Sequence, residues 1–315
     1  MNQVQLGRTG LSVSKICFGA LTIGPLQANL PVRAGAAVIR YGLEYGINFI
    51  DTAELYGTYA YIKEALRGWS SPVVIASKSY AYTRKDMAAS LEKARRGMNR
   101  DVIEIFLLHE QESALTLRGH RPALDFLLEA KTRGLVRAVG ISTHTVAGVE
   151  AAAAMPEIDV IHPIFNQAGL GILDGTREDM YAAIIQAWRA GKGIYAMKPI
   201  GGGNLIADAE NALRYVLNQP AIHAVAVGMK TVAEVEMNVA IAEGRPVPAA
   251  VRQRVNQERR CLHIEDWCAG CGTCVDTCRY AALAVVNGKL QVDPTKCLLC
   301  GYCGAACPQF CIKII

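Results

Sequence analysis

The chain has 315 residues, of which 51% are hydrophobic, so it is long enough for one large and one small domain. Its net charge of +5 is modest and no basic run stands out, which argues against a nucleic-acid-binding protein. The first residues resemble neither a signal peptide nor a twin-arginine signal, and no apolar run approaches the length of a membrane span, so we expect a cytoplasmic protein without a membrane partner.

Short β-rich runs alternate with helical periods along the first 245 or so residues. The runs that predict strands are Ile16–Gly19, Ile47–Ile50, Val73–Ala76, Ile103–Leu108, Val136–Ile141, Val160–Ile164, Ile194–Met197 and Ala224–Val227. Among the helical periods, Met87, Leu91, Ala94 and Met98 mark one helix face. Eight βα units of this length predict an α/β fold, a (β/α)8 TIM barrel over residues 1–245. A doubly wound sheet is the alternative, but no Gly-rich fingerprint follows the first predicted strand.

Polar residues stand at the ends of three successive predicted strands, where a barrel carries its active site. Asp51 follows the second strand, Lys78 the third and His109 the fourth, and Tyr56 lies in the loop after Asp51. Each residue alone has a structural explanation, but together they predict acid–base chemistry on a carbonyl. A Lys ammonium would lower the pKa of a nearby tyrosine below its free value of about 10, and a histidine could position the substrate oxygen.

With these residues in view, residues 1–245 resemble the aldo-keto reductase family. The opening L-G-R-T-G-L is similar to the family's N-terminal hairpin, and D-T-A-x-x-Y-G from Asp51 to Gly57 matches its Asp/Tyr motif. The resemblance implies that Tyr56 is the proton donor, that Asp51 and Lys78 tune it, and that His109 orients the carbonyl. It also implies a small-molecule carbonyl or alcohol substrate.

The same resemblance assigns positions to a nicotinamide dinucleotide, NAD(P)(H). They are Ser142, His162, Asn166, Met197, Lys198, Gly201, Gly228, Lys230, Thr231, Glu234 and Asn238. Four depart from the family pattern. His162 replaces a common Gln, and Met197-Lys198 replaces a common Tyr-Ser, so the aromatic that stacks on nicotinamide is missing. Glu234 stands where NADPH-preferring members carry Arg. The carboxylate of Glu234 would repel a 2′-phosphate, which favours NAD(H). Thr231 and Glu234 also form a capping-box pattern at the start of the last barrel helix.

A flavin is the alternative cofactor for the barrel. The missing aromatic at Met197 leaves room for it, and Lys198 offers a positive charge. The loop Gly201–Gly203 offers backbone donors near strands seven and eight, where barrels often bind phosphate. The same loop could instead be a tight turn.

Beyond the barrel, residues 246–260 contain Pro246, Pro248 and a charged run, which predicts a linker or, alternatively, a helix over Val251–Arg260. Residues 261–315 then repeat C-x2-C-x2-C-x3-C twice, which is the spacing of the bacterial ferredoxin run for two [4Fe–4S] clusters. Zinc would explain paired C-x2-C motifs but not triplets with a trailing cysteine.

In this run each fourth cysteine ligates the other cluster. The ligands expected for the first cluster are Cys268, Cys271, Cys274 and Cys307, and those for the second are Cys297, Cys300, Cys303 and Cys278. Asn287-Gly288 between two β-rich runs predicts a hairpin, and we expect the two halves to pair their strands about a pseudo-twofold axis. The segment resembles a bacterial two-cluster ferredoxin, a small α+β domain, although Arg279 replaces the usual proline.

Three functional hypotheses follow. The first is an iron–sulfur aldo-keto reductase whose barrel exchanges electrons with the fused ferredoxin domain, directly or through a flavin or nicotinamide, and with an external electron-transfer partner. In this hypothesis we expect a cluster over the barrel mouth. The second is an ordinary NAD(P)H-dependent reductase whose ferredoxin domain serves structure or docking. The third is an electron carrier or redox sensor built on a barrel without activity.

Overall fold

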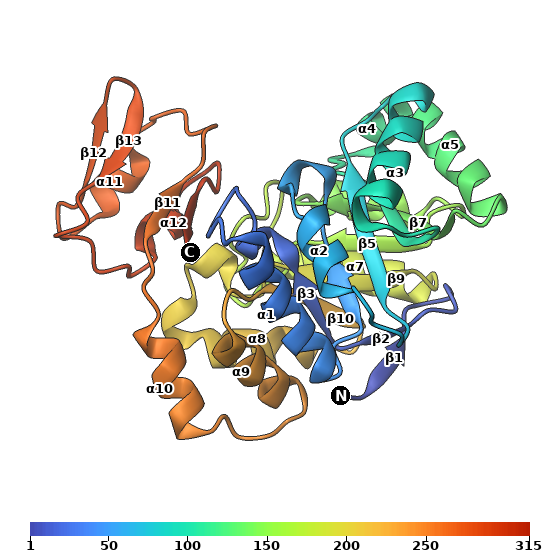
Figure 1. The fold of residues 1–315 in the computed structure, drawn as a ribbon. Coiled ribbons are helices and arrows are strands. Elements are labelled where there is room, and N and C mark those ends of the chain that lie inside the picture. Colours follow the sequence, from blue (N-terminus) through green and yellow to red (C-terminus); the bar gives the residue numbers. More distant parts are fainter.

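The computed structural model describes all 315 residues. Eight parallel strands close a barrel in the order β10-β3-β4-β5-β6-β7-β8-β9, which confirms the predicted TIM barrel (Figure 1). These strands are β3 (Ile16–Gly19), β4 (Phe49–Asp51), β5 (Val74–Ser79), β6 (Ile103–Leu108), β7 (Val136–Thr143), β8 (Val160–Pro163), β9 (Gly193–Met197) and β10 (Ala224–Gly228). The helices around them are α1 (Val32–Glu44), α2 (Tyr59–Ala65), α3 (Arg84–Met98), α4 (Ala114–Gly119), α5 (Arg121–Thr132), α6 (Val146–Ala153), α7 (Arg177–Arg189), α8 (Ala209–Leu217) and α9 (Val232–Ala242). None of the helices in the structure combines the length and apolarity needed to cross a membrane.

The barrel interior is closed at the amino-terminal end of its strands. There the N-terminal hairpin of β1 (Gln3–Gln5) and β2 (Ser12–Ser14) brings the buried side chains of Leu6 and Leu11 against the interior of the barrel. Because this end is filled with apolar side chains, the polar residues of the barrel gather at the opposite, carboxyl-terminal end of the strands.

The amphipathic periods read from the sequence bury the residues that they predict. Met87, Leu91, Ala94 and Met98 are all buried on α3. At the start of α9 the Thr231 side chain accepts a hydrogen bond from the Glu234 amide, as the capping-box pattern predicts. A full capping box would also have the Glu234 carboxylate accept from the Thr231 backbone N–H. Here that carboxylate accepts from the Lys230 backbone N–H instead, at 2.7 Å.

The chain between the domains is helical over α10 (Ala249–Gln257), so the helix alternative holds for most of this segment. The small domain follows as β11 (Leu262–Ile264), α11 (Thr273–Thr277), β12 (Leu283–Val286), β13 (Lys289–Val292), α12 (Tyr302–Ala306) and β14 (Ile312–Ile314). β12 and β13 form the predicted hairpin, and β11 pairs with β14. Each two-stranded sheet therefore takes one strand from each half of the duplicated segment, as the pseudo-twofold predicts.

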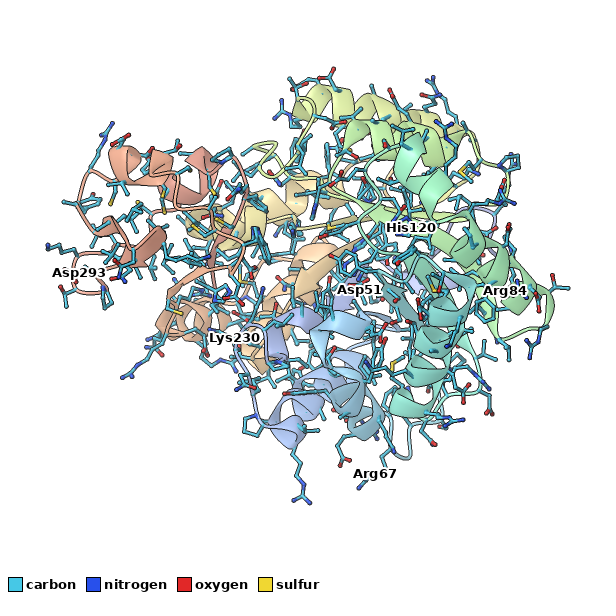
Figure 2. All side chains as sticks on the ribbon, turned by 90° about the horizontal axis from the view of Figure 1, so that it is seen from above. Asp51, Arg67, Arg84, His120, Lys230 and Asp293 are labelled. Atoms are coloured by element: carbon cyan, nitrogen blue, oxygen red, sulfur yellow. The ribbon has the colours of Figure 1, made fainter.

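The small domain docks at the carboxyl-terminal end of the barrel strands, against the loops after β8 and β9 (Figure 1). The Asn204 side chain donates to the Ile312 carbonyl at 3.1 Å, and Phe310 joins the hydrophobic core of the barrel. Figure 2 shows Asp51 inside the barrel, Asp293 on the far side of the small domain, and Lys230 on the side of the barrel that faces it. The duplicated cysteine segment thus lies at the end of the barrel that carries Asp51.

Candidate active site and cluster sites

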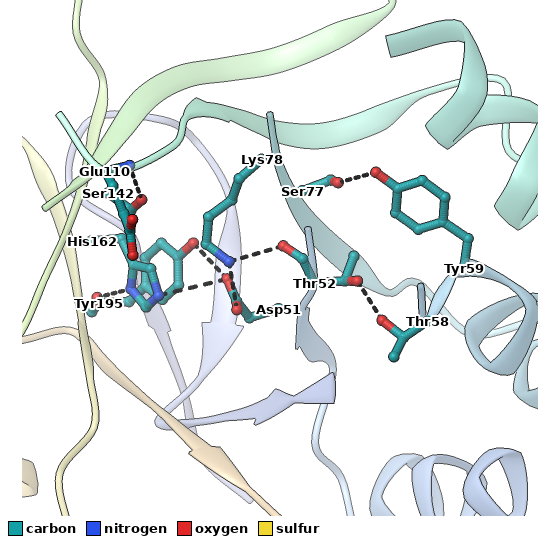
Figure 3. Close-up of polar contacts among 10 residues, drawn as sticks. All are labelled: Asp51, Thr52, Thr58, Tyr59, Ser77, Lys78, Glu110, Ser142, His162 and Tyr195. Atoms are coloured by element: carbon teal, nitrogen blue, oxygen red, sulfur yellow. Dashed lines mark hydrogen bonds and ion pairs between the residues drawn. The ribbon is translucent and has the colours of Figure 1, made fainter. Parts of the chain in front are cut away.

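A buried ion pair forms the base of the candidate active site (Figure 3). Lys78 Nζ donates to Asp51 Oδ2 and to the Thr52 carbonyl, both at 2.8 Å, and the Lys78 side chain is 1% exposed. The Tyr195 hydroxyl donates to the other carboxylate oxygen, Asp51 Oδ1, at 2.9 Å. A buried ion pair is tolerated when further hydrogen bonds satisfy it, and these contacts do so. The pair therefore holds a fixed position beneath the barrel mouth.

Tyr56 lies in the short 3-10 turn Glu54–Tyr56 that follows β4, and it is half-buried. Lys78 Nζ lies 4.8 Å from its ring centroid, and the ring meets that of His109 edge-on at 5.8 Å. Burial and, after it, the charges of Asp51 and Glu110 raise the pKa of Tyr56 well above its usual value. The net lowering of this pKa that was expected from Lys78 does not appear, because burial dominates. Tyr56 is a neutral phenol that can donate its proton.

His109 follows β6 directly and is buried. Tyr80 stacks on its ring at 4.3 Å, and its Nδ1 atom has no hydrogen-bond partner. Burial and the nearby Lys78 charge hold the pKa of His109 well below its usual value, so the imidazole is neutral. The structure thus brings all four predicted residues to one place: a phenol that can donate, a neutral imidazole beside it, and an ion pair behind both.

Two of the positions assigned to a dinucleotide belong to this polar network (Figure 3). The His162 ring stacks on Tyr195 at 3.8 Å, and its Nε2 lies 3.7 Å from Asp51 Oδ1. Burial lowers the pKa of His162 to about 4, although Asp51 acts in the opposite direction. Ser142 Oγ accepts a hydrogen bond from the Glu110 amide at 2.9 Å.

Other assigned positions are engaged in shaping the barrel rim. The Asn166 side-chain amide holds the loop at Leu170. Its oxygen accepts from the Leu170 backbone N–H and its nitrogen donates to the Leu170 carbonyl, each at 2.9 Å. Gly228 packs against Thr22 with no room for a side chain. Asn238 is buried in α9, and Met197 is half-buried at the end of β9.

The segment after α10 contacts the positions assigned to the phosphate end of a dinucleotide. Lys230 Nζ donates to the Arg259 carbonyl at 2.9 Å. Glu234 lies 3.4 Å from the Arg260 guanidinium, so its carboxylate has a cation beside it. From the sequence, Glu234 was interpreted as a free negative charge. In the structure it is paired with Arg260, 26 positions further along the chain.

The loop Gly201–Gly203 packs against the C-terminal strand. A Cβ on Gly202 would lie 2.7 Å from Lys313 Cδ, and one on Gly203 would overlap the Ile314 carbonyl oxygen. Both glycines have positive φ, 62° and 86°, which favours glycine there independently of contacts. This packing argues against the expectation that the loop binds a phosphate, because a phosphate at these glycines would have to displace β14.

Lys198 connects the barrel rim to the small domain. Its Nζ donates to His144 Nε2 at 2.9 Å and lies 5.2 Å from the ring centroid of Phe310. His144 Nδ1 in turn lies 3.7 Å from Glu110 Oε1. Burial lowers the pKa of Lys198, and burial together with Lys198 holds the pKa of His144 well below its usual value. Neither His144 nor Phe310 was predicted from the sequence.

The cysteines of the small domain line two separate cavities. The first is lined by Cys268, Cys271, Cys274 and Cys307, and the second by Cys278, Cys297, Cys300 and Cys303. The spacing predicts the same division. No group of three or more His, Cys, Asp or Glu side chains comes close enough together to hold a single metal ion. Eight thiols divided four and four, in this spacing, fit two [4Fe–4S] clusters.

A ninth cysteine, Cys311, also lines the first cavity, with its Sγ 3.4 Å from that of Cys307. It is buried, and its position beside the predicted ligand Cys307 places β14 directly against the first cavity. The strand that covers the Gly201–Gly203 loop therefore also forms a wall of this cavity.

Comparison with known proteins identifies both parts of the chain. A model of the aldo/keto reductase family matches residues 15–211, and a model of the 4Fe-4S dicluster domain matches residues 260–308. The first match covers more than half of the chain, so the chain belongs to the aldo/keto reductase family and is an oxidoreductase. It carries an iron–sulfur dicluster domain at its C-terminal end.

Individual relatives agree with this assignment. The chain is 24% identical over 282 residues to L-galactose dehydrogenase of Arabidopsis thaliana, which covers 75% of this chain and 86% of that protein. It is 29% identical over 181 residues to pyridoxine 4-dehydrogenase of Escherichia coli, covering 50% and 62%. Among solved structures, a putative aldo-keto reductase from Pseudomonas aeruginosa superposes with a TM-score of 0.66 at 27% identity, covering 77% of this chain and 95% of that one.

Several residues of the site have no signal in the sequence. Tyr195 lies inside a β-rich run, and its partner Asp51 is 144 residues away. Tyr80 follows Lys78 by two residues, which an extended strand would place on the same side, so this spacing is a weak signal. Glu265 lies close enough to Tyr56 for its charge to contribute to the raised pKa of that phenol, yet it comes from the small domain.

Proposed function

We propose that this protein interconverts a carbonyl and an alcohol in its barrel and exchanges the electrons with two [4Fe–4S] clusters in the small domain. The observation that carries the proposal is the course of the C-terminal segment. Arg259 and Arg260 contact Lys230 and Glu234, and β14 closes the Gly201–Gly203 loop. The segment that carries the clusters thus covers positions that a dinucleotide would need.

The barrel residues support the proton chemistry of such a reaction. The neutral phenol of Tyr56 donates its proton to the carbonyl oxygen as charge develops there, and recovers it in the reverse direction. The neutral imidazole of His109 positions that oxygen. The ammonium of Lys78, 4.8 Å from the Tyr56 ring, stabilises the phenolate left after donation, and Asp51 holds Lys78 in place.

For the clusters we propose two ligand sets. The first cluster takes Cys268, Cys271, Cys274 and Cys307, and the second takes Cys278, Cys297, Cys300 and Cys303. Each bound cluster supplies one electron at a time. Reduction of a carbonyl to an alcohol takes two electrons and two protons. Two reduced clusters together match the electron requirement of one turnover, Tyr56 supplies the proton on oxygen, and solvent water supplies the proton on carbon.

A nicotinamide or a flavin is the second route for these electrons. Aldo-keto reductases generally use NAD(P)H, and either carrier would convert single electrons into a pair. The positions that the family resemblance assigns to this route are Ser142, His162, Asn166, Met197, Lys198, Gly228, Lys230, Thr231, Glu234 and Asn238. In the arrangement seen here, either carrier has to share the rim with Phe310 and β14.

An external electron-transfer partner would reach the second cluster. Tyr280, Leu298 and Tyr302 line the second cavity and are 50%, 62% and 64% exposed. The first cavity lies on the side of β14, which packs against the barrel. The second cavity also reaches the barrel, because Gly301 lines it and packs against the Asn204 carbonyl. Both cavities therefore have a wall beside the barrel, and the exposed side chains of the second support electron entry there.

Rapid mixing tests the proposal. Anaerobic protein is reduced with dithionite, freed of nicotinamide and flavin, and mixed with candidate carbonyl substrates while cluster absorbance is followed. We expect reoxidation within one turnover, and its loss in Tyr56→Phe. Clusters that stay reduced during many nicotinamide-driven turnovers would show that the small domain serves only structure or docking.

A further inference from the structure

Two lysine side chains lie between the domains without a carboxylate partner. Lys313 of β14 is 4% exposed, its Nζ donates to the Phe310 carbonyl, and it lies 3.2 Å from the centroid of the Phe310 ring. Lys198 of the barrel rim approaches the same ring at 5.2 Å. Neither ammonium has a carboxylate oxygen within 4.0 Å.

The nearest acidic residues are engaged elsewhere. Glu110 faces His144 at 3.7 Å, and Glu265 faces His263 at 3.3 Å. A buried ammonium without a counter-charge is unfavourable, and a second ammonium beside it makes it more so. The face of an aromatic ring compensates only a small part of this cost. Burial and Lys198 lower the pKa of Lys313 to about 6, so this side chain needs an anion beside it to stay protonated at neutral pH.

The backbone holds both lysines in this arrangement. Lys198 has φ of 56° and Phe310 has φ of 47°, a left-handed conformation that is unfavourable for residues other than glycine. Each ammonium has three donors. The structure shows one bond from Lys198, to His144, and one from Lys313, to the Phe310 carbonyl, so each has donors left for a ligand.

These donors lie close to the carbonyl site. Lys198 contacts His144 at 2.9 Å, His144 lies 3.7 Å from the Glu110 carboxylate, and Glu110 directly follows His109. The mouth of the barrel therefore combines the candidate catalytic residues with two lysine side chains on one side. A small molecule could contact the catalytic residues with one end and the two lysines with the other.

We propose that Lys198 and Lys313 bind a carboxylate of the substrate, so that the reaction is the interconversion of a short oxo acid and a hydroxy acid. The inference rests on the proposed function, since Tyr56 and His109 are taken to hold the carbonyl. Charge-assisted hydrogen bonds from ammonium groups to a carboxylate are strong and specific. A dinucleotide phosphate is the other source of an anion, but Ile314 and Lys313 close the adjacent glycine loop against it.

Direct binding to the oxidised, cluster-loaded protein tests the inference without turnover, so its outcome does not depend on electron transfer. The probes are pyruvate and acetoacetate, each compared with its methyl ester by calorimetry. We expect at least one acid to bind about tenfold or more tightly than its ester. Lys198→Met and Lys313→Met should each remove this preference, and Lys313→Arg should keep most of it.

The matched control is Lys296→Met, an exposed lysine of the same domain whose partner is Asp293. It should leave acid binding unchanged, and iron content and visible spectrum should show that every variant keeps its clusters. Equal binding of acids and esters would overturn the inference. So would tighter binding of inorganic phosphate or NADH through the same two lysines. A changed cluster midpoint potential in Lys313→Met with acid binding intact would also overturn it, because the lysines would then serve the cluster.

Discussion

Gly203 and Ile314 meet backbone to backbone at the junction of the two domains. A side chain on Gly203 would overlap the Ile314 carbonyl oxygen, and Gly203 has φ of 86°. The barrel therefore accepts the C-terminal strand at a position where only glycine fits, and the docking of the small domain depends on a residue that contributes no side chain.

Gly203→Ala should loosen this docking. The substitution adds left-handed strain, about 1–3 kcal/mol, to a collision with Ile314. Gly244→Ala is a matched control, since Gly244 has φ of 68° but open space around its Cα, so it adds the strain without the collision. Limited proteolysis and small-angle scattering should show a released small domain in Gly203→Ala only. Equal behaviour of the two variants would contradict the importance of this contact.

Tyr56→Phe should abolish carbonyl turnover. General acid catalysis contributes about 10²–10⁴-fold, and no other residue of the site combines a donor hydroxyl with contact to Lys78 and His109. Steady-state rates on an identified substrate measure the loss, and circular dichroism with iron analysis checks the fold. Tyr45→Phe, on the exposed end of α1, is the control and should keep full activity. Wild-type turnover in Tyr56→Phe would exclude this active site.

Stability should fall on acidification below pH 6.5. Burial lowers the pKa of His162 to about 4 and those of His109 and His144 well below 6.5. From pH 6.5 down to the lowered pKa of each histidine, the unfolded chain binds a proton that the folded protein does not. The free energy of unfolding therefore decreases as pH falls through this range. The contribution of His162 reaches about 3 kcal/mol near pH 4. Thermal unfolding from pH 7.5 to 4.5 tests this, and His162→Asn should flatten the slope. A slope unaltered in that variant would contradict the assignment.

The cluster assignment predicts iron content. Anaerobic protein should contain close to eight iron atoms per chain, and Cys271→Ala should reduce this to about four. Cys261→Ser changes an exposed cysteine outside both cavities and should leave the iron content unchanged. Iron and sulfide analysis with electron paramagnetic resonance measures both variants. Stoichiometric zinc would refute the clusters.

The pair of Glu234 and Arg260 should set dinucleotide preference, if the barrel binds one. We expect NADH to bind more tightly than NADPH, because Glu234 disfavours a 2′-phosphate. Glu234→Arg should reverse this preference. Since Arg260 lies 3.4 Å from Glu234, Arg260→Gln should strengthen the preference for NADH. Fluorescence titrations of both nucleotides measure these shifts, and tighter NADPH binding by the unaltered protein would refute the expectation.

Local patterns predicted the barrel well. The strand Ile103–Leu108 was predicted with its observed bounds because an apolar run between polar residues marks a strand buried on both faces. β4 begins at Phe49, two residues later than predicted, because Ile47 closes the turn after α1 with a bond to the Gly42 carbonyl. The candidate catalytic residues could be named from the sequence because they stand at or near strand ends.

Contacts between distant segments were beyond sequence reasoning. Lys198 was predicted to offer its positive charge to a cofactor, whereas the structure places it between His144, 54 residues earlier, and Phe310. Glu234 was interpreted without Arg260. The Gly201–Gly203 loop has a composition typical of phosphate loops and of tight turns alike, and only the position of β14 shows what packs against it. In each case the partner belongs to another element, and its position depends on how the domains dock.

The docking of β14 also makes the barrel entrance sensitive to iron supply. The core of the small domain has nine buried residues, and four of them are cysteines, so the domain depends on its clusters for stability. We expect a chain that has lost its clusters to oxidation, or was made under iron starvation, to lack the folded domain that holds Ile314 against Gly203. Its entrance is then open on the side of Lys198. Iron availability thereby determines which molecules can reach the barrel as well as whether electrons arrive there.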